Sequence, residues 1–236
     1  MTLHDALAAW FTPAEAMAIA LSLKVALVAA LASVVPGIAV GWLLARRRFP
    51  GKALLDALVH LPLVLPPVVV GYVLLVGFGQ QGPLGRALAS LGMGVAFHWT
   101  GAALASAIMG FPLMVRAIRL SIEAVDPRLE QAAATLGAGR WRIFRSVTLP
   151  LALPGVVAGG VLAFAKALGE FGATITFVSS IPGQTQTLSS AIYGLMQVPG
   201  GESGIWRLAA VSVAISLAAL LVSEWLVRRQ RGEGAA

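Results

Sequence analysis

The sequence predicts an all-α integral membrane protein with about five transmembrane helices, folded as a single domain over residues 1–236. Its residues are 58% hydrophobic and only 11% charged, whereas a water-soluble domain carries roughly 25% charged residues. Five apolar segments approach or exceed the about 20 residues that a spanning helix needs. The chain contains no cysteine, so a disulfide framework and a thiolate metal site are both excluded.

The five predicted spans follow one another along the chain. The first, 17–45, is interrupted only by Lys24 and by Pro36 followed by Gly37. The second, 58–79, includes HLPLVLPPVVVGY, whose prolines remove backbone hydrogen-bond donors and bend a helix. Such a bend either walls a cavity or serves packing alone. The remaining spans cover 95–118, 151–171 and 205–227.

The basic residues give the topology, because most of the 17 Lys and Arg residues lie in three clusters beside these spans. Such clusters mark the cytoplasmic side. Five spans place all three there, with the N-terminus outside and the C-terminus cytoplasmic. The net charge of +7 is therefore a topology signal and does not indicate nucleic-acid binding. The start, MTLHDALAAWFTPAEAM, lacks the features of a signal peptide, so the first span is expected to direct insertion. The clusters are Arg46, Arg47, Arg48 and Lys52; Arg116, Arg119, Arg128, Arg140, Arg142 and Arg145; and Arg228, Arg229 and Arg231.

The segment 121–150 is predicted to be a rigid cytoplasmic docking element. It contains LEQAAATLGAGRWRIFRSVTLP, in which Gly137 separates two short helices. Pro127 suits the first helical turn, and Glu130 lies where a negative charge meets the helix dipole. Taken alone, Glu130 is equally an ordinary helix-end charge. The loop arginines Arg140, Arg142 and Arg145 contact lipid phosphates, the acidic surface of a partner, or both.

The segment 172–204 is expected to form a polar outer loop. No charged residue occurs from Phe171 to Gly201, yet hydroxyl and amide side chains are dense, and 188–196 is predicted to be a short helix. Irregular backbone at membrane depth requires surrounding protein or water. The segment is therefore either part of an outer mouth or a simple surface loop.

The fourth span carries two charges, Lys166 and Glu170, four residues apart on one helix face. Charges inside a membrane are costly and face protein or water. One interpretation is an outer gate that favours an anion, with Thr174 and Thr176 beside the path. The other is a snorkelling lysine neutralised by Glu170.

Catalysis by this chain is not expected. Gly51-Lys52 lacks the glycine and the hydroxyl residue of a phosphate-binding loop. His60 and His98 have no second ligand at metal spacing, so neither a metal site nor a cofactor is predicted. No nucleophile–base pair is evident. Energy for transport would have to arrive through a partner docked on 121–150.

The loop pattern resembles the EAA loop of importer-type ABC transporter permeases, with Gln131 in the family's glutamate position and Glu130 one place earlier. Which of the two contacts the ATPase stays open. Four stretches resemble molybdate permeases more specifically, with sulfate-thiosulfate permeases as relatives. They are RRRFPGKALLDALVHLPLVLPPVVVGYVLLVGFG (46–79), FPLMVRAIRLSIEAVDPRLEQAAATLGAGRWR (111–142), TLPLALPGVVAG (148–159) and GEFGATITFVSSIPGQTQT (169–187). The coupling residues that the resemblance implies are Glu130, Gln131, Ala132, Ala133, Gly137, Arg140, Leu149 and Pro150.

The resemblance implies a type I ABC importer permease fold and a homodimer in the bacterial cytoplasmic (inner) membrane. An ATPase subunit would bind each loop, and an extracytoplasmic binding protein would deliver molybdate or tungstate for alternating access. A sulfate/thiosulfate permease is the alternative. An ion-coupled secondary transporter would show internal repeats and more intramembrane ionisable residues. A scaffold without transport would not need the polar outer segment.

Overall fold

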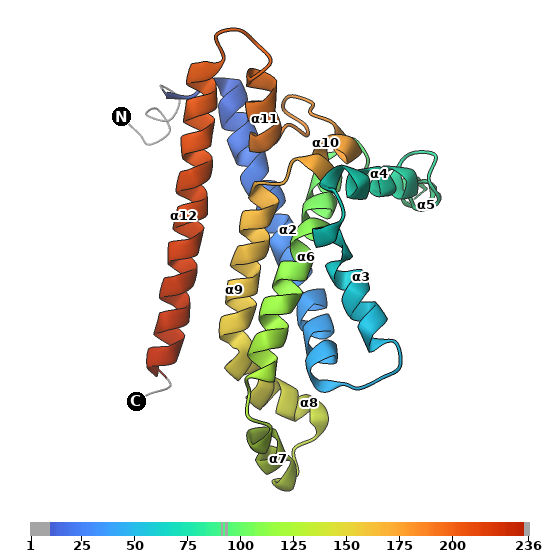
Figure 1. Cartoon of the computed structure of the whole chain (residues 1–236), viewed down its shortest axis with the longest axis vertical. Helices are drawn as coiled ribbons and strands as arrows, with labels where there is room; N and C mark the ends of the chain where they lie inside the picture. The colour runs from blue at the N-terminus through green and yellow to red at the C-terminus, as the bar shows by residue number, and fades with distance from the viewer. Residues whose placement is uncertain (1–9, 91, 93, 234–236) are drawn as a thin grey trace.

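The computed structural model describes residues 10–90, 92 and 94–233, and all regular structure within this part is helical. Residues 1–9, which hold most of the N-terminal stretch judged not to be a signal peptide, lie outside it, as do the side chains of the third basic cluster. Figure 1 shows an elongated bundle. The elements are α2 (Pro13–Arg46), α3 (Lys52–Val64), α4 (Pro67–Phe78), α5 (Pro83–Ala89), α6 (Trp99–Glu123), α7 (Pro127–Thr135), α8 (Arg140–Ile143), the π-helical turn η1 (Phe144–Thr148), α9 (Leu149–Leu168), α10 (Gly172–Val178), α11 (Leu188–Leu195) and α12 (Glu202–Glu233).

Four helices are long and apolar enough to cross a membrane, which confirms four of the predicted spans. They are α2, α6, α12 and the continuous helical segment Arg140–Leu168, which joins α8, η1 and α9. Helix α2 begins with a capping box, in which the Thr12 hydroxyl accepts from the N–H of Glu15 and the Glu15 carboxylate accepts from the N–H of Thr12. The basic residues Arg46–Arg48 and the helices α7 and α8 lie at one end of the bundle, hereafter the basic end; α10 and α11 lie toward the other, the polar end (Figure 1).

The second predicted span is not one continuous helix. It is divided into α3 and α4, with a bend of 112° between them. Leu65 is extended (φ −71°, ψ 143°) because the ring of Pro66 disfavours helical backbone before it. Pro66 and Pro67 also lack the N–H groups that would continue the helical ladder. The expected bend is therefore a break, and α4 projects sideways from the bundle toward α5 (Figure 1).

Helices α2, α6 and α9 pack closely at the centre of the bundle. A methyl group on Gly41 of α2 would lie 2.9 Å from Cγ2 of Ile118, and one on Gly159 of α9 would lie 3.0 Å from the carbonyl oxygen of Met114. Neither position has room for a side chain. Membrane helices associate through such small residues because surrounding lipid provides no hydrophobic driving force between them.

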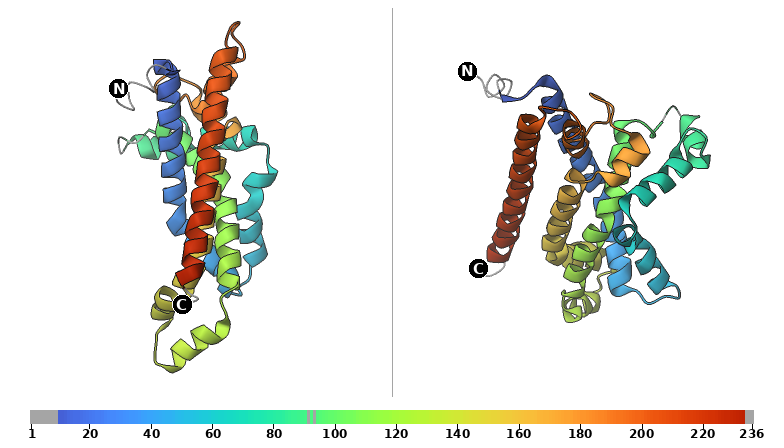
Figure 2. Two further views of the ribbon diagram at one scale, coloured as in Figure 1. Left: turned by 90° about the vertical axis from the view of Figure 1, so that its left-hand side faces the viewer. Right: turned by 45° about the horizontal axis from the view of Figure 1, so that its top comes forward.

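Two helices on opposite flanks contribute little to this core. Helix α3 has no buried residue, and only 6% of the apolar window of α12 is buried. Figure 2 shows α12 standing along one flank and α3 along the other. The flanks of a single chain therefore expose apolar surface to lipid or to a neighbouring protein.

The polar end is organised by short helices. The predicted helix at 188–196 is confirmed as α11, and its first N–H, that of Leu188, donates to Oγ of Ser22 on α2 at 2.6 Å. Helix α10 packs against α4, where a methyl group on Gly71 would lie 2.5 Å from the carbonyl oxygen of Ala173. The segment 172–204 is thus attached to the bundle by buried contacts on two sides.

Candidate functional site

The loop at the basic end folds as two short helices separated by glycine. Asp126 caps α7 by accepting the N–H of Arg128 at 2.9 Å, and Pro127 occupies the first turn as predicted. Helix α7 ends before Gly137, whose φ of +84° lies in the left-handed region that favours glycine. The chain then turns directly into α8, η1 and α9. The predicted helix and glycine break are confirmed, whereas the second helix is not separate and short, because it is the start of the continuous segment Arg140–Leu168.

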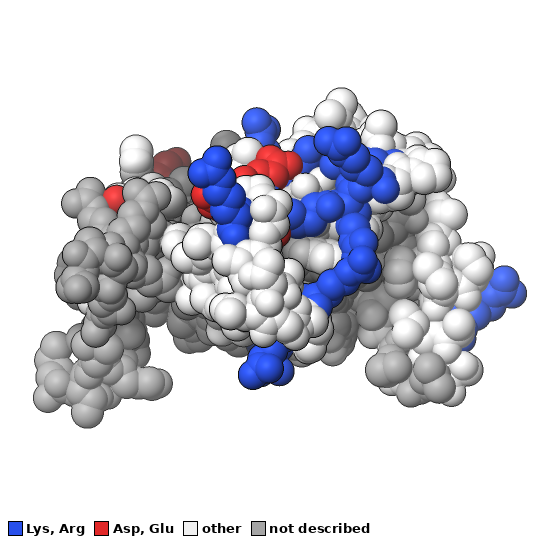
Figure 3. Space-filling view, turned by 90° about the horizontal axis from the view of Figure 1, so that it is seen from below, with Lys and Arg blue, Asp and Glu red and all other residues white. Residues whose placement is uncertain are grey.

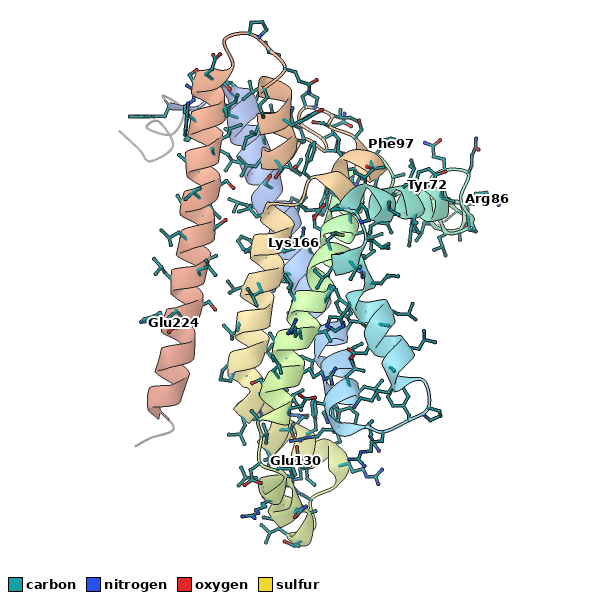
Figure 4. All side chains as sticks on the ribbon, in the orientation of Figure 1. Tyr72, Arg86, Phe97, Glu130, Lys166 and Glu224 are labelled. Atoms are coloured by element: carbon teal, nitrogen blue, oxygen red, sulfur yellow. The ribbon has the colours of Figure 1, made fainter. Side chains whose placement is uncertain are left out.

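Glu130 does not face away from the bundle. Its Oε1 accepts a hydrogen bond from the hydroxyl of Thr148 at 2.7 Å and forms an ion pair with Nη2 of Arg46 at 3.2 Å. The same Arg46 nitrogen donates to the carbonyl oxygen of Val125 at 2.9 Å. Figure 4 places Glu130 within the helices of the basic end. Arg46 and Glu130 therefore fix the loop onto the end of α2.

The outward surface of α7 is formed by other residues. Gln131 and Ala132 are exposed, Ala133 is half-buried, and Leu136 beside the glycine is 88% exposed. An exposed amide and small side chains leave a narrow helix surface that another protein can approach closely. Of the two candidate contact residues, Gln131 is accessible, whereas Glu130 is engaged within the chain.

Aromatic side chains connect the loop to α2. Trp42 makes an edge contact with Phe144 at a centroid distance of 6.0 Å, and Trp141 stacks on Phe144 at 5.5 Å. The guanidinium of Arg47 lies 5.1 Å from the Trp42 ring centroid. Figure 3, which views the molecule from the basic end, shows Lys and Arg spread over this face with fewer Asp and Glu. Arg140 is exposed, Leu149 is half-buried and Pro150 is exposed, at the start of α9.

The predicted charged pair is formed at the other end of α9. Lys166 Nζ lies 2.7 Å from Oε2 of Glu170, whose side chain is 1% exposed against 31% for Lys166. The other carboxylate oxygen of Glu170 accepts from the N–H of Ala173 at 3.0 Å. Glu170 thus holds the start of α10 against the end of α9, while Lys166 is only partly exposed near the end of α9 (Figure 4).

The two predicted path threonines direct their hydroxyl protons into their own helix. Thr174, which is buried, donates to the carbonyl oxygen of Phe171 at 2.9 Å, and Thr176 donates to that of Gly172 at 2.8 Å. Neither hydroxyl proton is therefore available to an anion. Among Lys166, Glu170, Thr174 and Thr176, only Lys166 carries a positive charge.

A second charged network, not predicted from the sequence, joins α3 to α6. Arg119 pairs with Oδ2 of Asp56 at 3.0 Å and with Oε1 of Glu123 at 2.8 Å. These groups, with His60 and Arg116, line a pocket of about 530 Å³. The i,i+4 spacings Asp56–His60 and Arg119–Glu123 were available signals.

Comparison with known proteins decides the family. Residues 37–232 match the family described as binding-protein-dependent transport system inner membrane component. The chain belongs to this family. It is a membrane transport subunit.

Two relatives of the permease are informative. It is 61% identical over 221 residues to the molybdenum transport system permease protein ModB of Escherichia coli (strain K12), which covers 93% of this chain and 96% of the relative. It is 40% identical over 185 residues to the sulfate transport system permease protein CysT of the same organism, covering 78% and 67%.

The fold of the permease occurs in solved ABC importers. A chain of a bacterial ABC transporter that imports the acidic polysaccharide alginate superimposes with a TM-score of 0.73 at 17% identity, over 97% of this chain and 84% of that chain. This likeness confirms the predicted importer permease fold.

The contacts that sequence reasoning missed come from residues distant in the chain. Arg46 served only as a topology marker, and Thr148 and Trp42 were not singled out. The i,i+4 rule cannot reveal an ion pair between the end of α2 and α7. Two signals for a buried role were nevertheless present in the sequence. Glu130 is a carboxylate among basic residues, and Trp42 lies one turn before the arginine cluster that begins at Arg46.

Proposed function

We propose that two copies of this chain form the translocation path of an ATP-driven importer for molybdate or the chemically similar tungstate. The observation that carries the proposal is the loop on which Gln131 and Ala132 are exposed while Glu130 is held by Arg46. Such a fixed, outward-facing helix suits an ATPase groove. The similarity of the chain to ModB over nearly its full length favours molybdate over sulfate.

The basic end lies in the cytoplasm in this proposal. Arginine-rich termini of spanning helices favour that side, and α2, α6 and α12 all run toward it (Figure 1). The N-terminus is then outside the bacterial inner membrane and the C-terminus inside. The segment 172–204, with α10 and α11, faces the binding protein that delivers the oxyanion. Residues 121–150 face the ATPase.

The coupling residues act together in this arrangement. Gln131, Ala132 and Ala133 present the contact surface, Gly137 sets the turn, and Glu130 fixes its orientation. Arg140, Leu149 and Pro150 lie where the loop passes into α9. Movement of the ATPase pair on ATP binding would be passed through this junction to α9, and from there to the outer mouth.

The outer part of the path passes the junction of α9 and α10. Lys166 supplies a positive charge that an oxyanion meets, while Glu170 limits its strength and Thr174 and Thr176 shape the adjoining wall. A permease that receives a preselected solute needs weak sites, because tight binding would prevent release. A lysine balanced by a carboxylate meets this requirement.

The test is ATP hydrolysis by the permease reconstituted with its ATPase and binding protein, titrated with molybdate, tungstate and sulfate. Molybdate should stimulate hydrolysis and uptake, and sulfate should not. Stimulation by sulfate alone would keep the ATP-driven mechanism but make sulfate, and not molybdate, the transported anion. Uptake that persists without ATP, driven by an ion gradient, would replace the proposal by a secondary transporter.

A further inference from the structure

An apolar groove runs along the basic end of α2. It has a volume of about 620 Å³, and its apolar walls come from α2 and α8. It is lined by the aliphatic residues Val35, Ile38, Ala39 and Leu43 and by the rings of Trp42 and Phe144. Val35 is 76% exposed. A groove of this character within a spanning helix suits a hydrocarbon chain.

A smaller, charged pocket of about 270 Å³ adjoins the groove. Trp42, Phe144 and Arg140 line both, so the two pockets are neighbours. The charged pocket adds Arg47, along with Arg46 and its partner Glu130. An apolar groove beside α2 thus lies next to a charged pocket at the end of the bundle.

The charged pocket has an excess of positive charge. Arg46 is neutralised by Glu130 at 3.2 Å. Arg47 contacts the Trp42 ring, and neither it nor Arg140 forms an ion pair with an acidic residue of the described chain. Two arginines without an acidic partner, beside an apolar groove at the end of a membrane helix, complement a lipid with an anionic headgroup.

We propose that this site binds one anionic phospholipid of the leaflet at the basic end, with an acyl chain in the groove and its phosphate between Arg47 and Arg140. The inference goes beyond the proposed transport function and does not depend on which oxyanion is carried. Phe144 belongs to η1 and stacks on Trp141. The bound lipid therefore contacts the junction between the loop 121–150, hereafter the coupling loop, and α9.

The test compares two lipids that differ only in headgroup charge. The purified permease is incubated with equimolar phosphatidylglycerol and phosphatidylcholine of identical acyl chains, and retained lipid is counted by native mass spectrometry. We expect about thirtyfold more phosphatidylglycerol than phosphatidylcholine, from an attraction of about 1 kcal/mol for each of the two arginines. Equal retention by the unaltered protein would overturn the proposal.

Matched variants locate the site. The double substitution Arg47→Gln, Arg140→Gln should abolish the preference for phosphatidylglycerol. Arg142→Gln, Arg145→Gln removes equal charge from positions that line neither pocket and should preserve it. An equal loss in both variants would indicate a diffuse surface effect and overturn the assignment.

Groove occupancy has a separate test. Ala39→Trp fills the groove and should lower retention of both lipids. Should that variant fail to fold, phosphatidylglycerol with a photoreactive acyl chain is used on the unaltered protein and should label peptides spanning 35–43. Absence of labelling there, or an efficient Val35→Cys disulfide between two copies in membranes, would show that lipid does not occupy the groove.

Discussion

The carboxylate of Glu15 and the guanidinium of Arg207 lie 2.7 Å apart, although 192 residues separate them in the chain. The Glu15 side chain is only 6% exposed, and its second oxygen accepts the N–H of Thr12 at 2.7 Å. The pair joins the beginning of α2 to the beginning of α12. Because α12 buries little apolar surface, this polar contact is an important attachment of the helix.

Removing the cation should loosen α12. Arg207→Leu leaves a buried carboxylate without its charged donor, and we expect a loss of about 2 kcal/mol in the free energy of unfolding. Thermal unfolding in detergent measures it. Arg86→Leu on α5 is the control, because Arg86 forms no ion pair within the described chain. Equal destabilisation by both substitutions would show that the Glu15 contact is not what holds α12.

Substitutions of Glu130 and Gln131 should have different effects, the first on stability and the second on binding of the ATPase. Glu130→Ala removes the partner of Arg46 and Thr148, so unfolding free energy should fall by about 1 kcal/mol. Gln131→Ala removes an exposed side chain and should leave stability unchanged while weakening association with the ATPase. Pull-down of the ATPase and thermal unfolding, measured on both variants, check the two effects. Reversed behaviour would place Glu130 at the partner interface.

Glycine should be required at position 137 because the backbone there is left-handed, and not because a side chain would collide with its neighbours. A methyl group there would meet nothing within 4 Å, yet φ is +84°. Gly137→Ala should therefore cost about 1 kcal/mol from left-handed strain. Gly139→Ala, at a φ of −68°, should cost less, because only the preference of the helix N-cap for glycine over alanine is lost. Gly137→Asn should recover part of the loss, because asparagine tolerates this conformation. Unfolding midpoints of the three variants decide the matter.

Gly71 should be required for space. A methyl group would lie 2.5 Å from the carbonyl oxygen of Ala173 and 2.9 Å from Cβ of Thr176, so Gly71→Ala must separate α4 from α10. We expect a loss of about 2 kcal/mol in stability. Gly77→Ala on the same helix meets nothing within 4 Å and should be neutral or slightly stabilising. Similar effects of the two substitutions would contradict close packing of α4 on α10.

Substitution of Lys166 should lower transport but not binding of the ATPase to the loop 121–150. Lys166→Met leaves Glu170 buried without its charged partner, and uptake should fall, while ATPase association at the basic end should persist. The double variant Lys166→Met, Glu170→Gln removes the unpaired charge and should restore stability without restoring uptake. Normal uptake by either folded variant would support a packing role for the pair.

The sequence predicted well those features that depend on short-range patterns. Apolar length identified the long helices, and Gly137 with its flanking alanines identified the break between α7 and α8. Prolines 66 and 67 predicted a bend but not its size, because the angle of 112° also depends on packing against α10. The contact of Arg46 with Glu130 and the groove between α2 and α8 arise from tertiary folding, which one-dimensional spacing does not encode.

The continuity of Arg140–Leu168 has a mechanical consequence. A helix of 29 residues is about 43 Å long at 1.5 Å per residue, so a tilt of about 5° at one end displaces the other by about 4 Å. Its loop end carries the π-helical turn η1, a local distortion of the kind often found at functional sites. Its far end carries the Lys166–Glu170 pair. The segment can thus act as a lever with its pivot beside the coupling loop, amplifying a small rotation there into a movement as large as the oxyanion itself.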